Sequence, residues 1–195
     1  MDNTAKTIQE NRTKLTVYMG GAGSGKSLVL QNIAVDYVLK GTNVIYVTVE
    51  LSEVFISSRI DNILEGRTTS GTLTVGKLPI NSSVNDILTY VNSLSITSDT
   101  VLVIDYVDLL IDSEELSGIN IPNISTIVTA AQTNRNSTVP SIHLKLLQSS
   151  SKTVMLKNND SAINFEVVKG SSKSVGNKFT LAYDKTTLRL ENLLD

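Results

Sequence analysis

The sequence predicts an α/β fold with a mostly parallel sheet flanked by helices and an antiparallel hairpin extension near the C-terminus. Three observations support this prediction. Apolar runs rich in β-branched residues alternate with segments of helical periodicity, which is typical of a parallel sheet covered by helices. A glycine-rich motif stands between the first apolar run and the first helical segment. From Ile163 onwards, short stretches that alternate apolar and polar residues are separated by turns, which indicates antiparallel strands.

The composition indicates one globular domain. The chain has 195 residues, of which 41% are hydrophobic and 18% charged, and it shows no internal repeat. We expect a polar N-terminal arm over residues 1–13 and a single domain over residues 14–195. The absence of cysteine excludes disulfides and thiolate metal sites. Because the formal net charge is −2, any binding of nucleic acid must come from local loops or from an assembly.

The N-terminus and the apolar runs bear on location. The N-terminus is polar and lacks the apolar core of a signal peptide. No apolar run approaches the length needed to span a bilayer. We therefore expect a cytoplasmic protein with no membrane partner.

The glycine-rich motif fits the pattern Gly, four residues, then Gly-Lys-Ser. Residues 15–19 before it read as a buried strand, and residues 28–39 after it read as a helix. The glycines allow successive backbone N–H groups to point at phosphate oxygens, and the helix N-terminus adds a partial positive charge. Lys26 can then reach the β- and γ-phosphates, and the Ser27 hydroxyl can bind Mg²⁺.

The motif therefore predicts a nucleoside triphosphate site that uses ATP and Mg²⁺, in preference to a glycine-rich turn that binds nothing. The predicted nucleotide-binding residues are Gly20, Gly21, Ala22, Gly23, Ser24, Gly25, Lys26, Ser27 and Leu28.

The spacing of apolar residues predicts the remaining elements. Buried strands are expected at 44–49, 101–104, 124–131 and 153–156, with a short strand at 72–75. Helices are expected from Ser52 to Leu64, from Ser82 to about Leu94 and after Pro140, whereas residues 106–123 hold only a short helical stretch near 113–116. The last segment is expected to form strands at 163–168, 178–183 and 187–191.

Polar residues follow three of the predicted buried strands. Ligands of open parallel sheets bind beyond the carboxyl ends of the strands, so these residues should converge on one edge. Asp105 can orient Mg²⁺ or its waters, or it can be a solvated strand-end carboxylate. Glu50 can accept the proton of an attacking water, or it can cap the following helix. Gln132 can sense the γ-phosphate, or it can satisfy loop backbone groups.

Other polar residues are weaker candidates. Asp108 and Asp112 are interpreted as loop charges and not as metal ligands. His143 is the single histidine and lies in a predicted helix, where a surface or core role is favoured over catalysis. The sequence contains no metal-ligand cluster and no Ser-His-Asp arrangement.

Several of these segments resemble the ATPase core of DnaB-type replicative helicases, especially those of tailed phages. Residues 17–61 carry GGAGSGKS, VIYVTVELS and SRID, and residues 101–106 read VLVIDY, like the family's Walker B strand. Residues 129–135, TAAQTNR, resemble the motif that ends in a sensor glutamine. Residues 150–156 and 163–191 resemble the strand that follows and the C-terminal hairpin.

This resemblance implies a RecA-like P-loop NTPase. It assigns nucleotide contacts and catalysis to Lys26, Glu50 and Gln132, and Mg²⁺ to Ser27 and Asp105. It also implies a sheet in which the buried strands, counted along the chain without the short strand at 72–75, are ordered two, three, four, one, five.

The chain departs from the family pattern in three places. Only a short arm precedes the core, and residues 106–123 are too short for the long helix that usually follows the Walker B strand. The basic element that acts on a neighbouring subunit's nucleotide is typically Lys-x-Arg, but here it reads Lys169-Gly170-Ser171, with Lys173 as a candidate substitute. Lysine lacks the planar fork of arginine, so turnover by the isolated chain is expected to be slow. The alternative for Lys169 and Lys173 is two solvated charges in a hairpin loop.

The leading hypothesis is the ATP-hydrolysing motor domain of a phage-type replicative DNA helicase. It would form a homo-oligomeric ring, such as a hexamer, around single-stranded DNA, which it would contact through basic residues such as Arg135 and Lys145. One alternative is a RecA-like nucleotide-binding regulatory or assembly module without unwinding activity. Another is a small recombination or loader ATPase.

Overall fold

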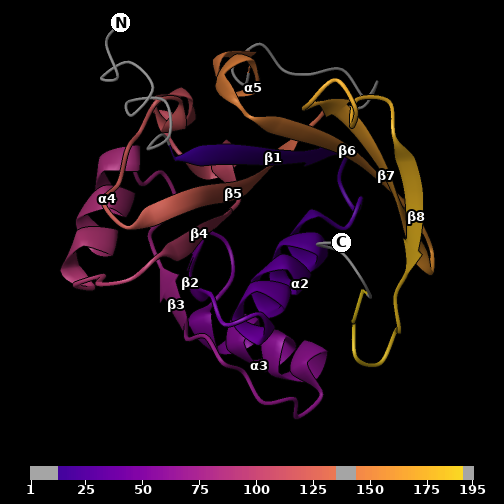
Figure 1. The fold of residues 1–195 in the computed structure, drawn as a ribbon, viewed down its shortest axis with the longest axis horizontal. Coiled ribbons are helices and arrows are strands. Elements are labelled where there is room, and N and C mark those ends of the chain that lie inside the picture. The colour runs from indigo at the N-terminus through magenta and orange to yellow at the C-terminus, as the bar shows by residue number, and fades with distance from the viewer. Residues whose placement is uncertain (1–12, 135–143, 191–195) are drawn as a thin grey trace, which may run out of the picture.

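A computed structural model describes residues 13–134 and 144–190. The described strands form one sheet in the order β3-β2-β4-β5-β1-β6-β7-β8 (Figure 1). Their bounds are β1 Lys14–Gly20, β2 Asn43–Thr48, β3 Leu73–Lys77, β4 Thr100–Asp105, β5 Ile124–Gln132, β6 Lys152–Asn159, β7 Ala162–Lys169 and β8 Lys178–Ala182. The helices are α2 Lys26–Leu39, α3 Glu53–Leu64, α4 Val84–Ser93 and α5 Leu144–Ser149, with 3₁₀ turns η1 Val107–Leu109 and η2 Ser113–Leu116.

The pairing of the strands confirms the predicted fold class. All pairs from β3 to β6 are parallel, whereas β6–β7 and β7–β8 are antiparallel. Without the short strand β3, the parallel part runs β2-β4-β5-β1-β6, which is the order that the family resemblance implied. The carboxyl ends of β1, β2, β4 and β5 therefore lie at one edge of the sheet.

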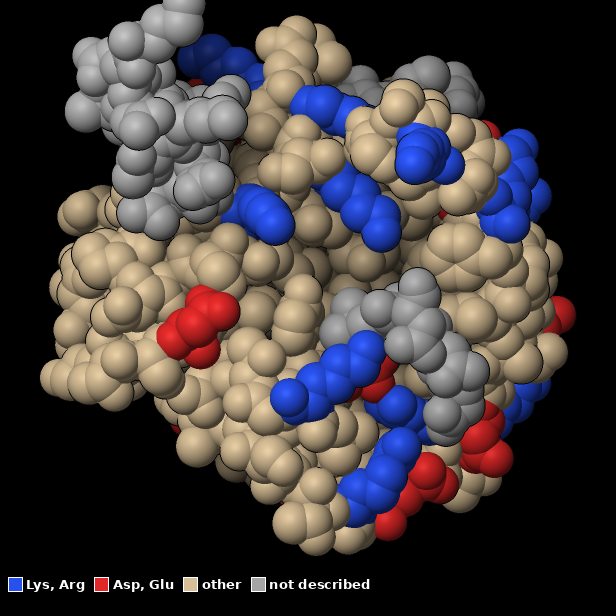
Figure 2. Space-filling view, viewed as in Figure 1, with Lys and Arg blue, Asp and Glu red and all other residues tan. Residues whose placement is uncertain are grey.

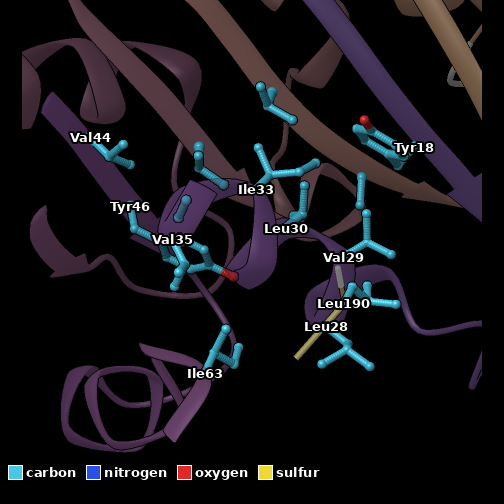
Figure 3. Packing of buried hydrophobic residues seen from close by; sticks show 14 of the residues in the cluster. Tyr18, Leu28, Val29, Leu30, Ile33, Val35, Val44, Tyr46, Ile63 and Leu190 are labelled. Atoms are coloured by element: carbon cyan, nitrogen blue, oxygen red, sulfur yellow. The ribbon is translucent and has the colours of Figure 1, made fainter. Parts of the chain in front are cut away.

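Helices cover both faces of the sheet, and each face has its own apolar cluster. Helices α2 and α3 pack on one face, where Figure 3 shows Leu30 and Ile33 of α2 among the other side chains of the cluster. Helices α4 and α5 pack on the other face. Because successive strand residues point to opposite faces, Val44 and Tyr46 join the first cluster and Ile45 and Val47 the second. A strand buried on both faces is apolar throughout, which is the pattern that predicted it.

Side-chain caps start α3 and α4 close to the predicted positions. Ser52 is the N-cap of α3, and its hydroxyl accepts the Phe55 N–H at 3.2 Å. Ser83 caps α4 in a reciprocal capping box with Asp86. Asp112 also accepts the Val84 N–H at 2.7 Å, so this predicted loop charge holds the start of α4.

The predicted strand at 187–191 is wrong over its described residues. Residues 187–190 make only an isolated bridge between Tyr183 and Leu190. The segment packs against α2 and not along the sheet. The Leu190 N–H donates to Asn32 Oδ1 at 2.7 Å, and Arg189 forms a buried ion pair with Asp36 at 2.6 Å.

Other predictions fall partly or wholly outside the described residues. These are residues 1–12 of the N-terminal arm, Arg135, His143, the start of the helix expected after Pro140, and Glu191. Within the described parts of the chain, no helix is both long and apolar enough to cross a membrane.

Candidate nucleotide-binding site

The glycine-rich loop occupies the turn between β1 and α2, as its motif requires. Gly23 and Gly25 have φ angles of 74° and 89°, in the left-handed region that favours glycine. A Cβ on Gly25 would also lie 2.6 Å from Cδ1 of Ile163. A Cβ on Gly20 would overlap the side chain of Ser24 and lie 2.8 Å from the Leu156 carbonyl oxygen. Backbone conformation and close packing therefore both require glycine in this loop.

Lys26 folds back over the loop from the first position of α2. Its ammonium donates to the carbonyl oxygens of Gly20 and Gly21 at 3.1 and 3.0 Å, and it lies 5.9 Å from the centroid of the Tyr106 ring. Burial lowers the pKa of the Lys26 ammonium. Nearby carboxylates oppose this effect and favour the charged form: Asp108, Asp105 and Glu50.

Ser27 and Asp105 form the second part of the site. The Ser27 hydroxyl donates to Asp105 Oδ1 at 2.9 Å, and the Tyr46 hydroxyl donates to Oδ2 at 2.7 Å. Asp105 is only 2% exposed. Burial raises the pKa of the Asp105 carboxyl, and the hydrogen bonds from Tyr46 and Ser27 partly oppose this rise.

The Ser27 hydroxyl and the Asp105 carboxylate fit the preference of Mg²⁺ for hard oxygen ligands. The described residues contain no group of three or more histidine, cysteine or carboxylate side chains able to hold a metal. A Mg²⁺ ion that is held by one or two protein oxygens, with phosphate and water as its other ligands, needs no such group. The donor set at Ser27 and Asp105 is therefore compatible with Mg²⁺ bound together with a nucleotide.

A cavity of about 440 Å³ lies over the glycine-rich loop and the start of α2 (residues 20–28, the candidate phosphate loop) and brings the strand-end residues together. Glu50 and Gln132 line it with Ala22 to Leu28, as the strand-end argument predicted. Glu50 is exposed and does not cap α3, because Ser52 does so. The other lining residues are Arg59, Tyr106, Asn158, Tyr183 and Leu188.

Several of these lining residues were missed from the sequence. Asn158 lies near the end of β6, the strand next to β1, and donates from Nδ2 to the Gly23 carbonyl at 3.2 Å. The rule that identified Glu50 and Gln132 would have found it. Arg59 lies on α3, and its Nε is buried without a hydrogen-bond partner among the described residues. Its position nine residues after Glu50 carries no strand-end signal, but it lies in the SRID segment that resembles the helicase family.

Lys169 and Lys173 lie at the opposite edge of the sheet from this loop. β7 runs antiparallel to β6, so Lys169 pairs with Thr153 near the start of β6, whereas the phosphate loop follows the far end of β1. The Lys169 ammonium donates to the carbonyls of Leu147 and Gln148 at the end of α5, at 2.7 and 2.5 Å. Lys173 is exposed in the turn after β7. Neither lysine can reach the phosphate loop of its own chain.

The predicted nucleic-acid contacts are only partly described. Lys145 is exposed in the first turn of α5, and Arg135 lies outside the described residues. Among the described residues, Lys145 has no ion-pair partner. On the face that Figure 2 shows, several Lys and Arg side chains gather in the upper half, around β1, β6 and α5, where few acidic side chains are visible. The net negative charge of the chain therefore does not prevent a local basic surface.

Comparisons with known proteins identify the fold. No protein-family model matches the sequence, and no curated protein matches it significantly. The structure matches the ATPase domain of a phage helicase with a TM-score of 0.70 and 12% identity, over 92% of this chain and 84% of that one. It also matches a DnaB-like replicative helicase, solved in a study of its interactions with primase, with a TM-score of 0.69 and 12% identity, over 93% of this chain. The chain spans 59% of that helicase's length. The chain therefore has the RecA-like fold of these helicase ATPase domains, as the sequence resemblance implied.

Proposed function

We propose that this chain is the ATP-hydrolysing motor domain of a phage-type replicative DNA helicase. The observation that supports it most strongly is the hydrogen bond from Ser27 to Asp105 beside Lys26, under a cavity that Glu50 and Gln132 also line. This combination provides phosphate donors, oxygen ligands for Mg²⁺, a base and a γ-phosphate sensor within one site. A phosphate loop alone would indicate only nucleotide binding.

Each residue has a distinct task in this proposal. The backbone N–H groups of residues 20–28 and the Lys26 ammonium hold the triphosphate. Ser27 and Asp105 would hold Mg²⁺, which would supply positive charge beside the triphosphate. Glu50 orients a water and takes its proton, and Gln132 hydrogen-bonds the γ-phosphate.

The assembly that we propose is a homo-oligomeric ring acting on single-stranded DNA in the cytoplasm, which for a phage protein is that of the host. The phosphate loop and the two candidate trans-acting lysines lie at opposite sheet edges, which supports head-to-tail contacts between copies. Head-to-tail interfaces close into rings when the rotation permits. Lys169 or Lys173 would then act on the neighbouring nucleotide, and Arg135 and Lys145 would contact the DNA.

The test is ATP turnover measured with and without single-stranded DNA, together with the assembly state. We expect DNA-stimulated hydrolysis that is lost in Lys26→Ala and in Glu50→Gln, with the second variant still binding ATP. Retained ATP binding would separate loss of the base from loss of the site. Absence of DNA-stimulated hydrolysis under every assembly condition would exclude the motor function.

A second candidate function is a nucleotide-binding regulatory, assembly or loader module that does not unwind DNA. Two observations favour it over an ordinary helicase core. The helical elements of residues 106–123, between β4 and β5, are only 3₁₀ turns, and the Lys169 ammonium is engaged with carbonyls at the end of α5. ATP-dependent strand displacement that disappears in Lys26→Ala would rule this candidate out.

A further inference from the structure

Asp108 contacts the backbone of the predicted sensor residue. Both of its carboxylate oxygens accept the Gln132 N–H, at 3.0 and 2.9 Å. Asp108 lies in η1, three residues after Asp105, and Gln132 ends the neighbouring strand β5. The two residues are 24 positions apart in sequence, so this contact ties the segment after β4 to the end of β5.

The geometry of the sheet explains why Gln132 needs this partner. Successive N–H groups of a strand point to opposite neighbours. The Thr133 N–H donates to the Gly20 carbonyl on β1, so the Gln132 N–H points toward β4. The ladder between β4 and β5 ends at the pair Ile104–Thr129, before it reaches Gln132. Asp108 therefore supplies the acceptor that the ladder no longer provides.

The contact fixes Gln132 on both sides. The β1 side is held by the ladder pair with Gly20 and by the Thr133 N–H, and the β4 side is held by a charged carboxylate. Hydrogen bonds to charged groups are stronger than neutral ones. The negative charge of Asp108 also opposes the lowering of the Lys26 pKa that burial causes. One carboxylate thus supports two residues that line the same cavity.

We propose that Asp108 is a positioning residue of the phosphate site, which holds the backbone of Gln132 so that its side chain meets the γ-phosphate. This proposal rests on the proposed ATPase function. Asp108 touches no reacting atom, so its loss should lower turnover more than nucleotide binding. A misplacement of about 1 Å can reduce a rate by about 100-fold.

Asp112 offers a matched control in the same segment. Its carboxylate also accepts a backbone N–H, from Val84 at the start of α4, and Asp112 does not line the nucleotide cavity. If Asp108 only stabilised its segment, removing Asp112 would have similar consequences. Asp108→Asn provides a second comparison, because the amide oxygen can still accept the Gln132 N–H but carries no charge.

The first measurement is hydrogen exchange of the Gln132 amide in the nucleotide-free protein, resolved to the single residue. We expect exchange to accelerate about 10- to 100-fold in Asp108→Ala, to accelerate less in Asp108→Asn, and to be unchanged in Asp112→Ala. Unchanged exchange in Asp108→Ala would overturn the proposal. This measurement requires no ATPase activity, so it tests the hold of Asp108 on the Gln132 backbone separately from the proposed function.

The second measurement is steady-state hydrolysis of ATP by the same variants. We expect Asp108→Ala to lower kcat by about 10- to 100-fold with little change in KM, Asp108→Asn to recover much of this loss, and Asp112→Ala to keep kcat near that of the wild type. An equal loss of kcat in Asp112→Ala, or a kcat of Asp108→Ala within about twofold of wild type, would overturn the proposal. If the wild type itself does not hydrolyse ATP, the proposed function fails and the exchange result stands alone.

Discussion

The hydroxyl of Ser27 donates to Oδ1 of Asp105 at 2.9 Å and joins the first turn of α2 to the carboxyl end of β4. The other oxygen of Asp105 accepts the Tyr46 hydroxyl from β2 at 2.7 Å. Three elements thus meet at one buried carboxylate, where Mg²⁺ would be held beside the phosphates. Variants of Ser27 and of Asp105 therefore test the role of the site in metal binding separately from its role in stability.

Replacing Ser27 tests the proposed Mg²⁺ site. Ser27→Ala removes one oxygen ligand and should weaken Mg²⁺-dependent ATP binding by at least about tenfold, because even outer partners of a metal site are worth about 10- to 100-fold. Ser27→Thr keeps the hydroxyl and should bind nearly as well as wild type. Calorimetric titration with ATP in Mg²⁺ and in a chelator measures the effect. Equal losses of affinity in both conditions would show that the hydroxyl does not serve a metal.

Asp105→Asn should uncouple stability from function. Burial raises the pKa of Asp105 above its ordinary value of 3.8 in the folded protein. The folded state therefore holds this proton more tightly, which stabilises the protein at low pH. This stabilisation is lost as the pH rises through the raised pKa.

The asparagine variant carries no charge to bury. Its stability relative to wild type should therefore increase as the pH rises from about 3.8 through the raised pKa, while Mg²⁺-dependent hydrolysis is lost. Denaturant unfolding at several pH values checks the trend. A stability difference independent of pH, or one that shrinks over this range, would contradict the assigned pKa shift.

Gly25→Ala should lower the free energy of unfolding by more than the strain of a left-handed backbone alone. Gly25 has φ 89° and would place a Cβ 2.6 Å from Ile163 Cδ1, whereas Gly118 has φ 93° and has no heavy atom within 4 Å of such a Cβ. We expect Gly118→Ala to cost about 1–2 kcal/mol from conformation. Gly25→Ala should cost about 2–5 kcal/mol, because overpacking adds to that strain. Chemical denaturation of both variants provides the comparison, and equal losses would show that Ile163 does not confine the loop.

Two ion pairs of the described C-terminal residues should differ strongly in their contribution to stability. Arg189–Asp36 joins the segment after β8 to α2, with side chains only 8% and 7% exposed, whereas Lys178–Glu166 is 69% and 44% exposed. Arg189→Met leaves a carboxylate buried and should cost about 3–5 kcal/mol. Lys178→Met should cost about 0–1 kcal/mol.

A double variant distinguishes the contribution of the ion pair from the cost of leaving the Asp36 carboxylate buried without Arg189. Replacing Asp36 by Leu in the Arg189→Met background should recover part of the lost free energy of unfolding, since no charge then remains buried. Thermal or urea unfolding of the single and double variants completes this cycle. Additive losses would indicate that the two side chains do not interact.

The local sequence pattern predicted the elements better than it predicted the contacts between them. Strands such as 101–104 are apolar throughout because both of their faces are covered. The motif at the phosphate loop needs glycine at fixed positions. Both features could therefore be predicted from the sequence. The alternation in residues 187–191 showed only that one side of the segment is apolar. It could not show that Leu188 and Leu190 pack on the side of α2 instead of joining the sheet.

The local sequence pattern likewise does not reveal contacts between a side chain and a backbone group far away in the sequence. The sequence predicts only a loop charge at Asp108, because no local pattern shows that the β4–β5 ladder stops short of Gln132. It predicts the same for Asp112, which holds the start of α4. Both depend on where two strands or helices end relative to each other, which is set by the three-dimensional packing and not by the residues nearby.

Mixed assemblies provide the sharpest test of the proposed trans-acting role of Lys169 and Lys173. Lys26→Ala lacks phosphate binding but keeps both lysines, and a Lys169→Ala/Lys173→Ala variant keeps the phosphate loop but lacks them. If ATP is hydrolysed between copies, each variant should be inactive alone, and mixing them should restore part of the turnover. Each restored interface would then combine an intact loop with an intact lysine.

The single lysine variants separate the two residues. Lys169→Ala should also lower stability by about 1 kcal/mol, because its ammonium donates to two carbonyls at the end of α5. Lys173 is exposed in the turn after β7, so its loss should leave stability unchanged and affect only turnover. If mixing restores no ATP turnover although ATP-dependent assembly persists, both lysines have a structural role or are solvated charges. The nucleotide of the neighbouring copy then has another partner. If, of the two single variants, only Lys173→Ala is complemented by mixing with Lys26→Ala, the trans contact is assigned to Lys173. Only a residue that is needed at the neighbouring site can be complemented in this way.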